Sequence, residues 1–153
     1  MRWKEIGRSL RFGLESEYLV CSRPKMDPLW YKQLTFAELN SLIESIPLDG
    51  LPSLCGLEVE PPHRKQMPFV VEGYHLPDMD FQAKDLLPKG LEIRTPVCSS
   101  LPELLSVHQE LHSRLRSASR DRGLEVVALS HHPLESEFSG PQNKRRHDYW
   151  LWS

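Results

Sequence analysis

The chain has 153 residues, of which 39% are hydrophobic and 26% are charged, so it can bury a core and is neither disordered nor fibrous in composition. Its formal net charge of −2 argues against a general nucleic-acid binder, because nothing would neutralise a phosphate backbone as a whole. The start has no signal-peptide pattern, and no apolar run is long enough to span a bilayer. We expect one cytoplasmic domain over residues 1–153, with no nucleic-acid or membrane partner.

The cysteines predict a reduced protein. Cys21, Cys55 and Cys98 are odd in number, widely spaced and never part of a C-x-x-C pair. Thiols of this kind are typical of a reducing compartment, so neither a disulfide framework nor a zinc site is expected.

Capping signals and apolar periodicity together predict two helices. Thr35 and Glu38 have the spacing of a capping box, and apolar residues then recur at helical spacing over about 36–46. A second box begins at Ser100, and its helix is expected to end at Gly123. An arginine run on the second helix is expected to form a solvated face rather than a ligand site. The run consists of Arg114, Arg116, Arg120 and Arg122.

Apolar patterns predict strands on both sides of the second helix. Residues 90–96 alternate between apolar and charged positions, and 124–130 form a denser apolar run, so the helix would connect two strands as a crossover unit. The stretch 12–20 predicts a further strand, and weaker patterns cover 57–60 and 69–74. These elements predict an α+β fold.

Two carboxylates lie close together in the first strand. Strand side chains alternate between faces, so Glu15 and Glu17 point one way while Leu14, Ser16 and Tyr18 point the other. Two like charges on one face repel each other and lose solvation unless a cation or a basic partner meets them. The pair therefore suggests a divalent-metal site.

Glu92 would join this pair if the strand at 90–96 lies in the same sheet. Asp85 precedes it by an odd number of positions, which puts it on the opposite face of a straight strand, although a turn or bulge before Gly90 would restore it. Oxygen ligands on a rigid sheet suit Mg²⁺. The alternative is a set of exposed acids that form ordinary salt bridges with Lys89 and Arg94.

Two basic or histidine-containing segments are weaker candidates, while P-loop, Rossmann, zinc-protease and nucleophile-elbow motifs are absent. His131 and His132 directly follow the strand at 124–130, where they would contact phosphate or carboxylate or lie in a solvent-facing loop. Arg145 and Arg146 belong to a basic cluster that forms either a surface patch or a contact to the anionic end of a substrate or polyphosphate.

Three ordered segments resemble glutamate-cysteine ligase family 2, the carboxylate-amine ligases related to glutamine synthetase. Residues 13–19 are similar to the opening G-x-E-x-E-aromatic-hydrophobic strand of that family. Residues 92–98 resemble its E-x-x-T-P-V-C segment, which a helix follows there as here. Residues 130–133 resemble its H-P element after the next strand. Together the segments and the elements between them cover nearly the whole chain.

The resemblance implies ATP- and Mg²⁺- or Mn²⁺-dependent ligation of a carboxylate to an amine through an acyl phosphate. In the namesake reaction of glutathione biosynthesis, glutamate and cysteine give γ-glutamylcysteine; another acceptor amine stays open for this chain. The resemblance also implies a partial, mainly antiparallel sheet of the glutamine synthetase type with two main helices on one face.

Site residues follow from the same resemblance, position by position. Glu15, Glu17 and Glu92 would be catalytic and metal-binding carboxylates, with Asp85 as a further metal ligand and His132 at the edge of the active site. Three arginines are expected to contact the anionic parts of a substrate or nucleotide, the last two on the basis of charge alone. They are Arg94, Arg145 and Arg146.

The length of the chain departs from that family, whose members are considerably longer. The end of the chain at 148–152 is aromatic and apolar, as expected for a segment that lacks packing partners. We expect the N-terminal part of a longer ligase catalytic domain, which self-associates or pairs with a C-terminal half. The alternatives are a non-catalytic homologue that binds metal, an amino acid or a nucleotide or pairs with a full-length relative, and a metal-dependent hydrolase.

Overall fold

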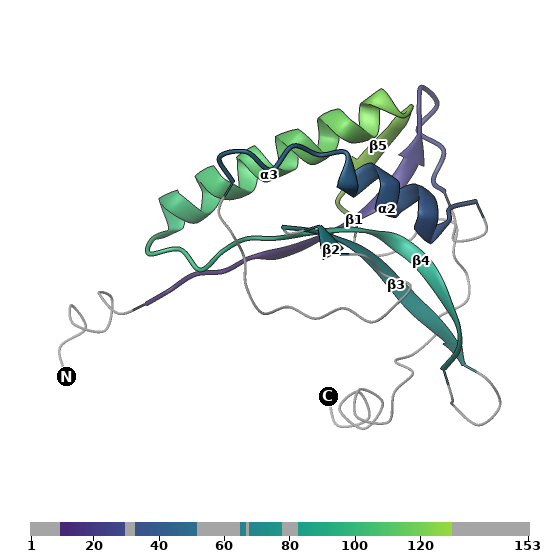
Figure 1. Ribbon diagram of the computed structural model, residues 1–153, viewed down its shortest axis with the longest axis horizontal. Coiled ribbons are helices and arrows are strands. Elements are labelled where there is room, and N and C mark those ends of the chain that lie inside the picture. Colours follow the sequence, from purple (N-terminus) through teal and green to yellow (C-terminus); the bar gives the residue numbers. More distant parts are fainter. Residues whose placement is uncertain (1–9, 30–32, 52–64, 67, 78–82, 130–153) are drawn as a thin grey trace.

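The computed structural model describes residues 10–29, 33–51, 65–66, 68–77 and 83–129, which form an antiparallel sheet and two helices (Figure 1). The strands are β1 (Glu15–Ser22), β2 (Lys65–Gln66), β3 (Phe69–Pro77), β4 (Ala83–Arg94) and β5 (Leu124–Val127). The helices are α2 (Phe36–Glu44) and α3 (Leu101–Asp121). No helix within these ranges is both long enough and apolar enough to cross a membrane.

The strands lie in the order β2-β3-β4-β1-β5, and every neighbouring pair is antiparallel. Since β4 and β5 are each antiparallel to β1, they run parallel to one another, and α3 connects them across one face of the sheet. The N-terminal strand thus lies between the two strands of the predicted crossover unit. The predicted α+β class and the antiparallel sheet are confirmed.

Both helices pack on the same face of the sheet, as Figure 1 shows. The largest side chains of this core are fully buried, and they come from α2, α3 and alternate positions of the central strands. They include Leu39, Leu42, Ile43, Leu111, Leu115, Phe69, Val71, Leu91 and Ile93. The opposite face of the sheet is therefore the one that remains for polar residues.

The predicted caps are present at both helices. The Thr35 hydroxyl accepts from the backbone N–H of Glu38 at 3.2 Å, and the Glu38 carboxylate accepts from the backbone N–H of Thr35 at 2.9 Å. Ser100 caps α3 in the same way, but Glu103 bonds to the backbone N–H of Ser99 instead of that of the N-cap. Gly123, at φ +72°, follows α3 in the left-handed conformation expected of a helix stop.

Strand boundaries differ more from prediction than helix boundaries do. β1 begins at Glu15, because Phe12 forms only an isolated bridge with Cys98. β4 begins at Ala83, well before the predicted start at Gly90, since a bulge carries the strand past Pro88. The predicted strand at 57–60 lies outside the described residues.

The arginines of α3 form more than a solvated face. The Nη1 atom of Arg114 donates to the backbone oxygens of Pro47 at 2.7 Å and Asp49 at 3.0 Å. The Nη2 atom of Arg122 donates to the backbone oxygen of Ser41 at 2.7 Å. These two side chains fasten α3 to α2 and to the turn after it, and the other two hold a buried carboxylate of β5.

Candidate functional site

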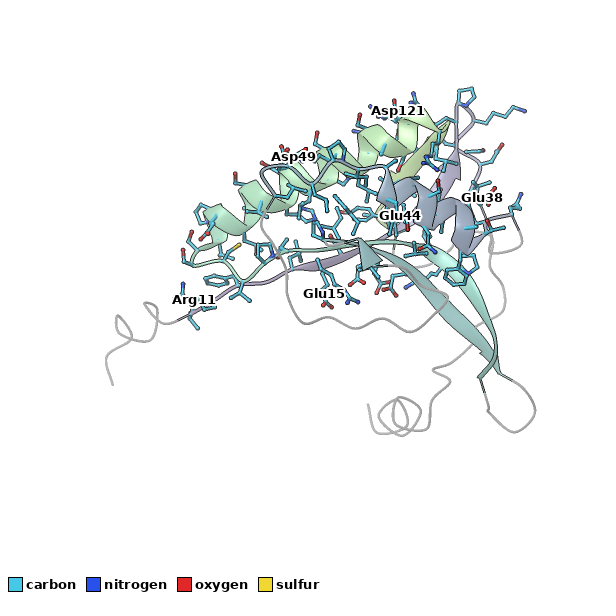
Figure 2. The ribbon with its side chains drawn as sticks, viewed as in Figure 1. Arg11, Glu15, Glu38, Glu44, Asp49 and Asp121 are labelled. Carbon is cyan, nitrogen blue, oxygen red and sulfur yellow. The ribbon has the colours of Figure 1, made fainter. Side chains whose placement is uncertain are left out.

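The face of the sheet opposite the helices carries four carboxylates and two bases from three adjacent strands. In the β1–β4 register Glu17 lies opposite Glu92, and Glu15 lies opposite Arg94, so all four positions share this face. Figure 2 shows Glu15 on the side of the sheet away from α2 and α3. We call this surface the carboxylate face, and it consists of Glu15, Glu17, Glu72, Glu92, Lys89 and Arg94.

Arg94 lies at the centre of the carboxylate face. Its Nη2 atom is 2.8 Å from Glu92 Oε2 and 3.7 Å from Glu72 Oε1, and its Nε atom is 3.7 Å from Glu15 Oε1. The close contact with Glu92 raises the pKa of Arg94 above its ordinary value, more than burial lowers it. A permanently charged guanidinium therefore holds three acids from three strands.

A bulge in β4 brings the second base onto this face. The register passes from Glu72 opposite Gly90 to Gly73 opposite Pro88, so Lys89 is the extra residue of β4. Its ammonium group forms a salt bridge with Glu17. The bulge thus supplies a cation that regular alternation would have directed to the other face.

The same bulge changes the register position of Asp85. Because Lys89 is an extra residue of β4, the alternation of the strand shifts by one position before it. Asp85, which pairs with Leu76, therefore falls in phase with Glu72 and Glu92. The hypothesis that a bulge would return Asp85 to the face of Glu92 agrees with this backbone register. The side chain of Asp85 lies outside the described set, and its role as a metal ligand stays a prediction.

Glu72 has the most perturbed carboxyl group of the face. Burial, a hydrogen bond with Glu92, and repulsion from Glu92 and Glu17 together raise its pKa to about 8, against an opposing effect of Lys89. Its side chain is 24% exposed, while that of Glu92 is 4% exposed. Near neutral pH, Glu72 therefore keeps a proton that it can donate to the Glu92 carboxylate.

Replacing Glu72 by Gln is expected to stabilise the protein increasingly as pH rises. The folded pKa is raised from 4.5 to about 8, so the wild-type protein loses stability as pH rises through this window, because the carboxyl group ionises in the unfolded chain while it keeps its proton in the fold. Gln keeps the donor and does not ionise. We expect the free energy of unfolding of Glu72→Gln to gain about 2 kcal/mol over that of the wild-type protein between pH 4.5 and about 8. Urea denaturation with a chelator present measures this difference.

The matched control for this prediction is Glu110→Gln, which removes an exposed carboxylate from α3 at a pair with Arg114. Its stability should stay parallel to that of the wild-type protein over the same pH range, apart from a constant offset of about 0.5 kcal/mol or less. Parallel curves for Glu72→Gln as well would contradict the assignment of the shared proton.

Hydrogen bonds join the two segments that carry the strongest sequence patterns. The Thr95 hydroxyl accepts from the backbone N–H of Leu14 at 2.8 Å, and the backbone N–H of Thr95 donates to the oxygen of Leu14 at 2.9 Å. Two further backbone bonds, at 3.0 and 2.7 Å, join Phe12 and Cys98. The strand at 13–19 and the segment at 92–98 are thus fixed side by side, which places their acids on one surface.

On the helix side, β1 is anchored by a polar contact within the core. The Ser16 hydroxyl lies 2.8 Å from Nε2 of His108, and the Tyr18 hydroxyl lies 3.1 Å from the same nitrogen. Burial, assisted by the neighbouring His112, lowers the pKa of His108, so its ring is kept neutral. This contact fixes the strand from behind and leaves Glu15 and Glu17 to face the other way.

The carboxylate face has the donor chemistry for a hard divalent cation. Glu92 Oε2 is buried, and it lacks a well-directed hydrogen bond within the described residues even though Arg94 is close. However, no group of three or more His, Cys, Asp or Glu side chains in the described ranges is arranged to hold a metal ion. The acids present suit Mg²⁺ in type, while they do not by themselves form a complete ligand set.

The predicted site residues other than Asp85 fall into two groups. The structure brings Glu15, Glu17, Glu92 and Arg94 onto one surface. The salt bridges to Lys89 and Arg94 that were named as the alternative explanation of these acids are present as well. The second group, His132, Arg145 and Arg146, lies outside the described residues, and the roles of its members stay predictions.

Glu72 and Glu125 were missed at the sequence level. Glu72 is an acid inside the apolar strand pattern at 69–74. Alternation along this strand puts its side chain on the same face as that of Val70, which is the face opposite the core. Glu125 is another single acid within an apolar run, and its side chain is buried. A lone acid in an apolar strand is thus the pattern that marks both.

Comparison with known proteins identifies the family. The model of glutamate-cysteine ligase family 2 matches residues 11–150, which include both strand segments of the carboxylate face. No curated protein and no solved structure matches the chain. Because the family match spans most of the sequence, the chain belongs to glutamate-cysteine ligase family 2.

Proposed function

We propose that the carboxylate face is the metal- and phosphate-handling surface of an ATP- and Mg²⁺-dependent carboxylate-amine ligase. The proposal rests on one observation above all: acids from β1, β3 and β4 converge there, in a chain whose family is that of glutamate-cysteine ligases. The reaction would join the side-chain carboxylate of glutamate to cysteine or another amine through an acyl phosphate. Mn²⁺ would serve as an alternative metal.

The charge balance of the face supports this role. With Glu72 protonated, three carboxylates face the two cations Lys89 and Arg94, which leaves a surplus of one negative charge, and ionisation of Glu72 would leave two. A divalent cation would compensate that second state. When bound, Mg²⁺ would neutralise phosphate oxygens, and Glu15, Glu17, Glu72 and Glu92 are the residues that would hold it in this proposal.

The arginine of the face would orient the reacting groups. Arg94 is fixed by Glu92, and its side chain is 18% exposed, so it presents a guanidinium of set orientation. Such a group binds carboxylate or phosphate oxygens in pairs and does not lose its charge. We assign Arg94 to the positioning of an anionic substrate group near the acids. The buried thiols of Cys21 and Cys98 agree with a cytoplasmic protein.

Ligase activity is tested by ADP release from the purified chain supplied with ATP, Mg²⁺, glutamate and cysteine. We expect release that depends on both amino acids and falls about 100-fold in Glu92→Gln, because an electrostatic contact to the reacting phosphate is lost. Glu110→Gln, on an exposed face of α3, should keep its activity. No ADP release by the wild-type chain at any protein concentration would reject autonomous ligase activity.

A second candidate function is binding without catalysis, and the ion pairs of the carboxylate face favour it. Lys89 and Arg94 already compensate two of the acids, and Glu72 shares a proton with Glu92, so the face is stable as it stands. In this case the protein binds a metal, an amino acid or a nucleotide, or pairs with a full-length relative.

Calorimetric titration with Mg²⁺ and Mn²⁺ separates the two candidates. Metal binding without ADP release would support the second. In either case, Glu15→Gln combined with Glu92→Gln should weaken metal binding at least about tenfold, because two oxygen ligands lose their charge. Metal affinity that is unchanged in this double variant would reject the carboxylate face as the metal site.

A further inference from the structure

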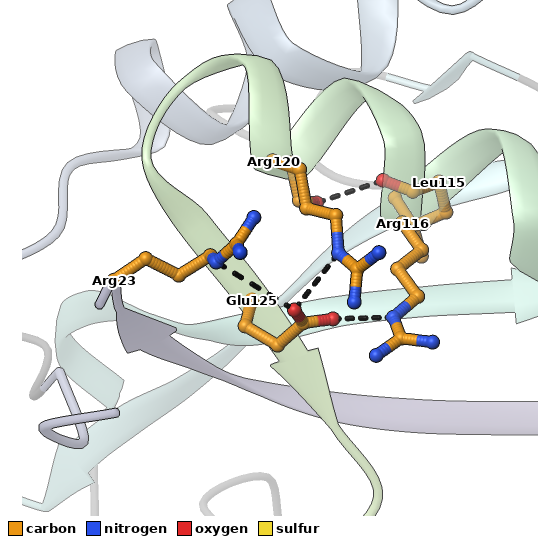
Figure 3. A network of polar contacts seen from close by, with 6 residues as sticks. Arg23, Leu115, Arg116, Arg120 and Glu125 are labelled. Atoms are coloured by element: carbon orange, nitrogen blue, oxygen red, sulfur yellow. Dashed lines mark hydrogen bonds and ion pairs between the residues drawn. The ribbon is translucent and has the colours of Figure 1, made fainter. Parts of the chain in front are cut away.

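A cluster of three arginines surrounds one buried carboxylate at the end of α3 (Figure 3). The carboxylate is that of Glu125 in β5, which is 5% exposed. Its Oε1 atom accepts from Nε of Arg116 at 2.5 Å, and its Oε2 atom accepts from Nε of Arg120 at 2.9 Å. Nε of Arg23 lies 4.0 Å from Oε2. We call Arg23, Arg116 and Arg120 the arginine cluster.

The arginine cluster carries more charge than its partner needs. Three guanidinium groups against one carboxylate leave a surplus of two positive charges, and no other acid of the described residues pairs with them. The three side chains are 40–46% exposed. Cations at positions 116 and 120, one helical turn apart, also repel each other. The surplus is therefore concentrated at one accessible place.

The three arginines of the cluster contact Glu125 through Nε and not through their terminal nitrogens. Arg116 and Arg120 contact Glu125 through Nε, and the contact of Arg23 also runs through Nε. Within the described part of the chain, their terminal Nη atoms donate no hydrogen bond, and the dashed lines that reach these arginines in Figure 3 end on Nε. Each side chain thus keeps a fork of N–H groups that can meet an anion.

Arg114 of α3 and Arg122, the C-cap residue of that helix, provide an internal comparison. The Nη1 atom of Arg114 donates to two backbone oxygens, and both Nη atoms of Arg122 contact Ser41. Their terminal nitrogens therefore serve the fold. Only at Arg116 and Arg120 does the helix hold its guanidinium groups by Nε and leave the terminal atoms without a described partner.

We propose that the arginine cluster binds a phosphate dianion, either free inorganic phosphate or a phosphoryl group of a nucleotide. Two oxygens of such an anion match the fork geometry of guanidinium groups, and its two negative charges equal the surplus of the cluster. Glu125 fixes the forks in advance, which reduces the ordering that binding requires.

The proposed phosphate site is separate from the carboxylate face and does not depend on the ligase proposal. Both lie along β1, but Glu17 and Arg23 are six residues apart in the sequence, which corresponds to about 20 Å of extended chain. Burial alone would raise the pKa of Glu125, yet the hydrogen bonds from Arg116 and Arg120 hold it below its usual range. The carboxylate thus stays ionised at neutral pH and continues to hold the two helical arginines.

The test is a titration of the ¹⁵N-labelled protein, in which the arginine Nε–H signals are followed by NMR at constant ionic strength. Inorganic phosphate should shift the signals of Arg116 and Arg120 in a saturable way, with a dissociation constant of about 1 mM or tighter, and leave that of Arg114 in place. Equal shifts with chloride, or no saturation by about 10 mM phosphate, would overturn the proposal.

Variants and a second ligand complete the test. Arg116→Gln leaves Arg120 on Glu125 and should weaken phosphate binding at least about tenfold, whereas Arg114→Gln should leave it unchanged. Arg23→Gln, outside the helix, should lower the affinity also, and it serves if Arg116→Gln does not fold. Unchanged affinity in every cluster variant would refute the site. A titration with ATP identifies the source: tighter binding than that of inorganic phosphate indicates a nucleotide, and weaker binding indicates the free anion.

Discussion

Replacing Gly90 by Ala should lower the free energy of unfolding by about 3 kcal/mol or more, because β1 passes directly over this position. A Cβ atom built on Gly90 would lie 2.1 Å from the backbone oxygen of Tyr18 and 3.1 Å from its carbonyl carbon. These are backbone atoms of a central strand pair, so a side-chain rotation cannot relieve the overlap. Strands β1 and β4 would have to separate.

Gly13→Ala is the matched control, since a Cβ atom there would meet nothing within 4 Å. It should change stability by less than about 1 kcal/mol, and a small gain is expected because the unfolded chain loses freedom. Urea denaturation of both variants, followed by circular dichroism, measures the difference. Equal midpoints for Gly90→Ala and Gly13→Ala would show that β4 does not approach β1 as closely as described.

The same substitution should also damage the carboxylate face. Gly90 lies between the bulged Lys89 and Glu92, and Glu92 faces Glu17 across the strand pair that the new methyl group would force apart. Loss of metal affinity in folded Gly90→Ala protein would therefore be a consequence of strand separation. The close approach of two backbones at a glycine thus links the stability of the sheet to the geometry of its acids.

Local signals predicted those parts of the fold that depend on neighbouring residues. The capping box at Thr35 and the stop at Gly123 each involve a few consecutive residues, and both were confirmed. Alternation placed Glu15 and Glu17 on one face for the same reason. Alternation could add Glu92 only on the condition that the two strands share a sheet, and the family resemblance supported that condition, because strand pairing joins residues far apart in the chain.

Features that depend on pairing register could not be predicted. A bulge before Gly90 was one of two alternatives at the sequence level, next to a turn, and its position at Lys89 and the continuous strand from Ala83 become visible only when β3 and β4 are aligned. The raised pKa of Glu72 likewise needs the positions of Glu92 and Glu17. Such properties arise from contacts across strands, whereas a sequence pattern reports mainly on contacts along one.

The contacts of the arginines on α3 could not be predicted from the sequence either. A run of cations on an exposed helix face is typical of a solvated surface, and nothing in the sequence distinguishes Arg116 from Arg114. The fold separates them, because β5 returns beside the end of α3 and presents Glu125 to Arg116 and Arg120. The buried Glu125 of β5 thus binds Arg116 and Arg120 through Nε, and their terminal nitrogens stay without a described partner.

Removing Arg116 and Arg120 together, as Arg116→Gln with Arg120→Gln, is expected to destabilise the protein by about 3–5 kcal/mol, because the carboxylate of Glu125 stays buried without hydrogen-bonded partners. Each single variant leaves one partner in place, so its effect should be less than half as large. Adding Glu125→Gln to the double variant should restore most of the loss, because the buried charge is then absent. Urea denaturation of the wild-type protein and the four variants measures the coupling.

The contribution of Glu125 to stability changes with pH in opposite directions in the wild-type protein and in the double variant. This difference distinguishes a charge effect from lost packing. In the wild-type protein the folded pKa of Glu125 is lowered, so its contribution to stability is present above the ordinary value of 4.5 and is lost as pH falls. In the double variant only Arg23, 4.0 Å away, still opposes the effect of burial, so that pKa rises relative to the wild-type protein, and the variant is relatively more stable at low pH and loses stability as pH rises. The gap between the two proteins should therefore widen from acid to neutral pH. A gap that stays constant over this range would mean that Arg116 and Arg120 stabilise the fold through their aliphatic stems, and that Glu125 does not depend on their charge.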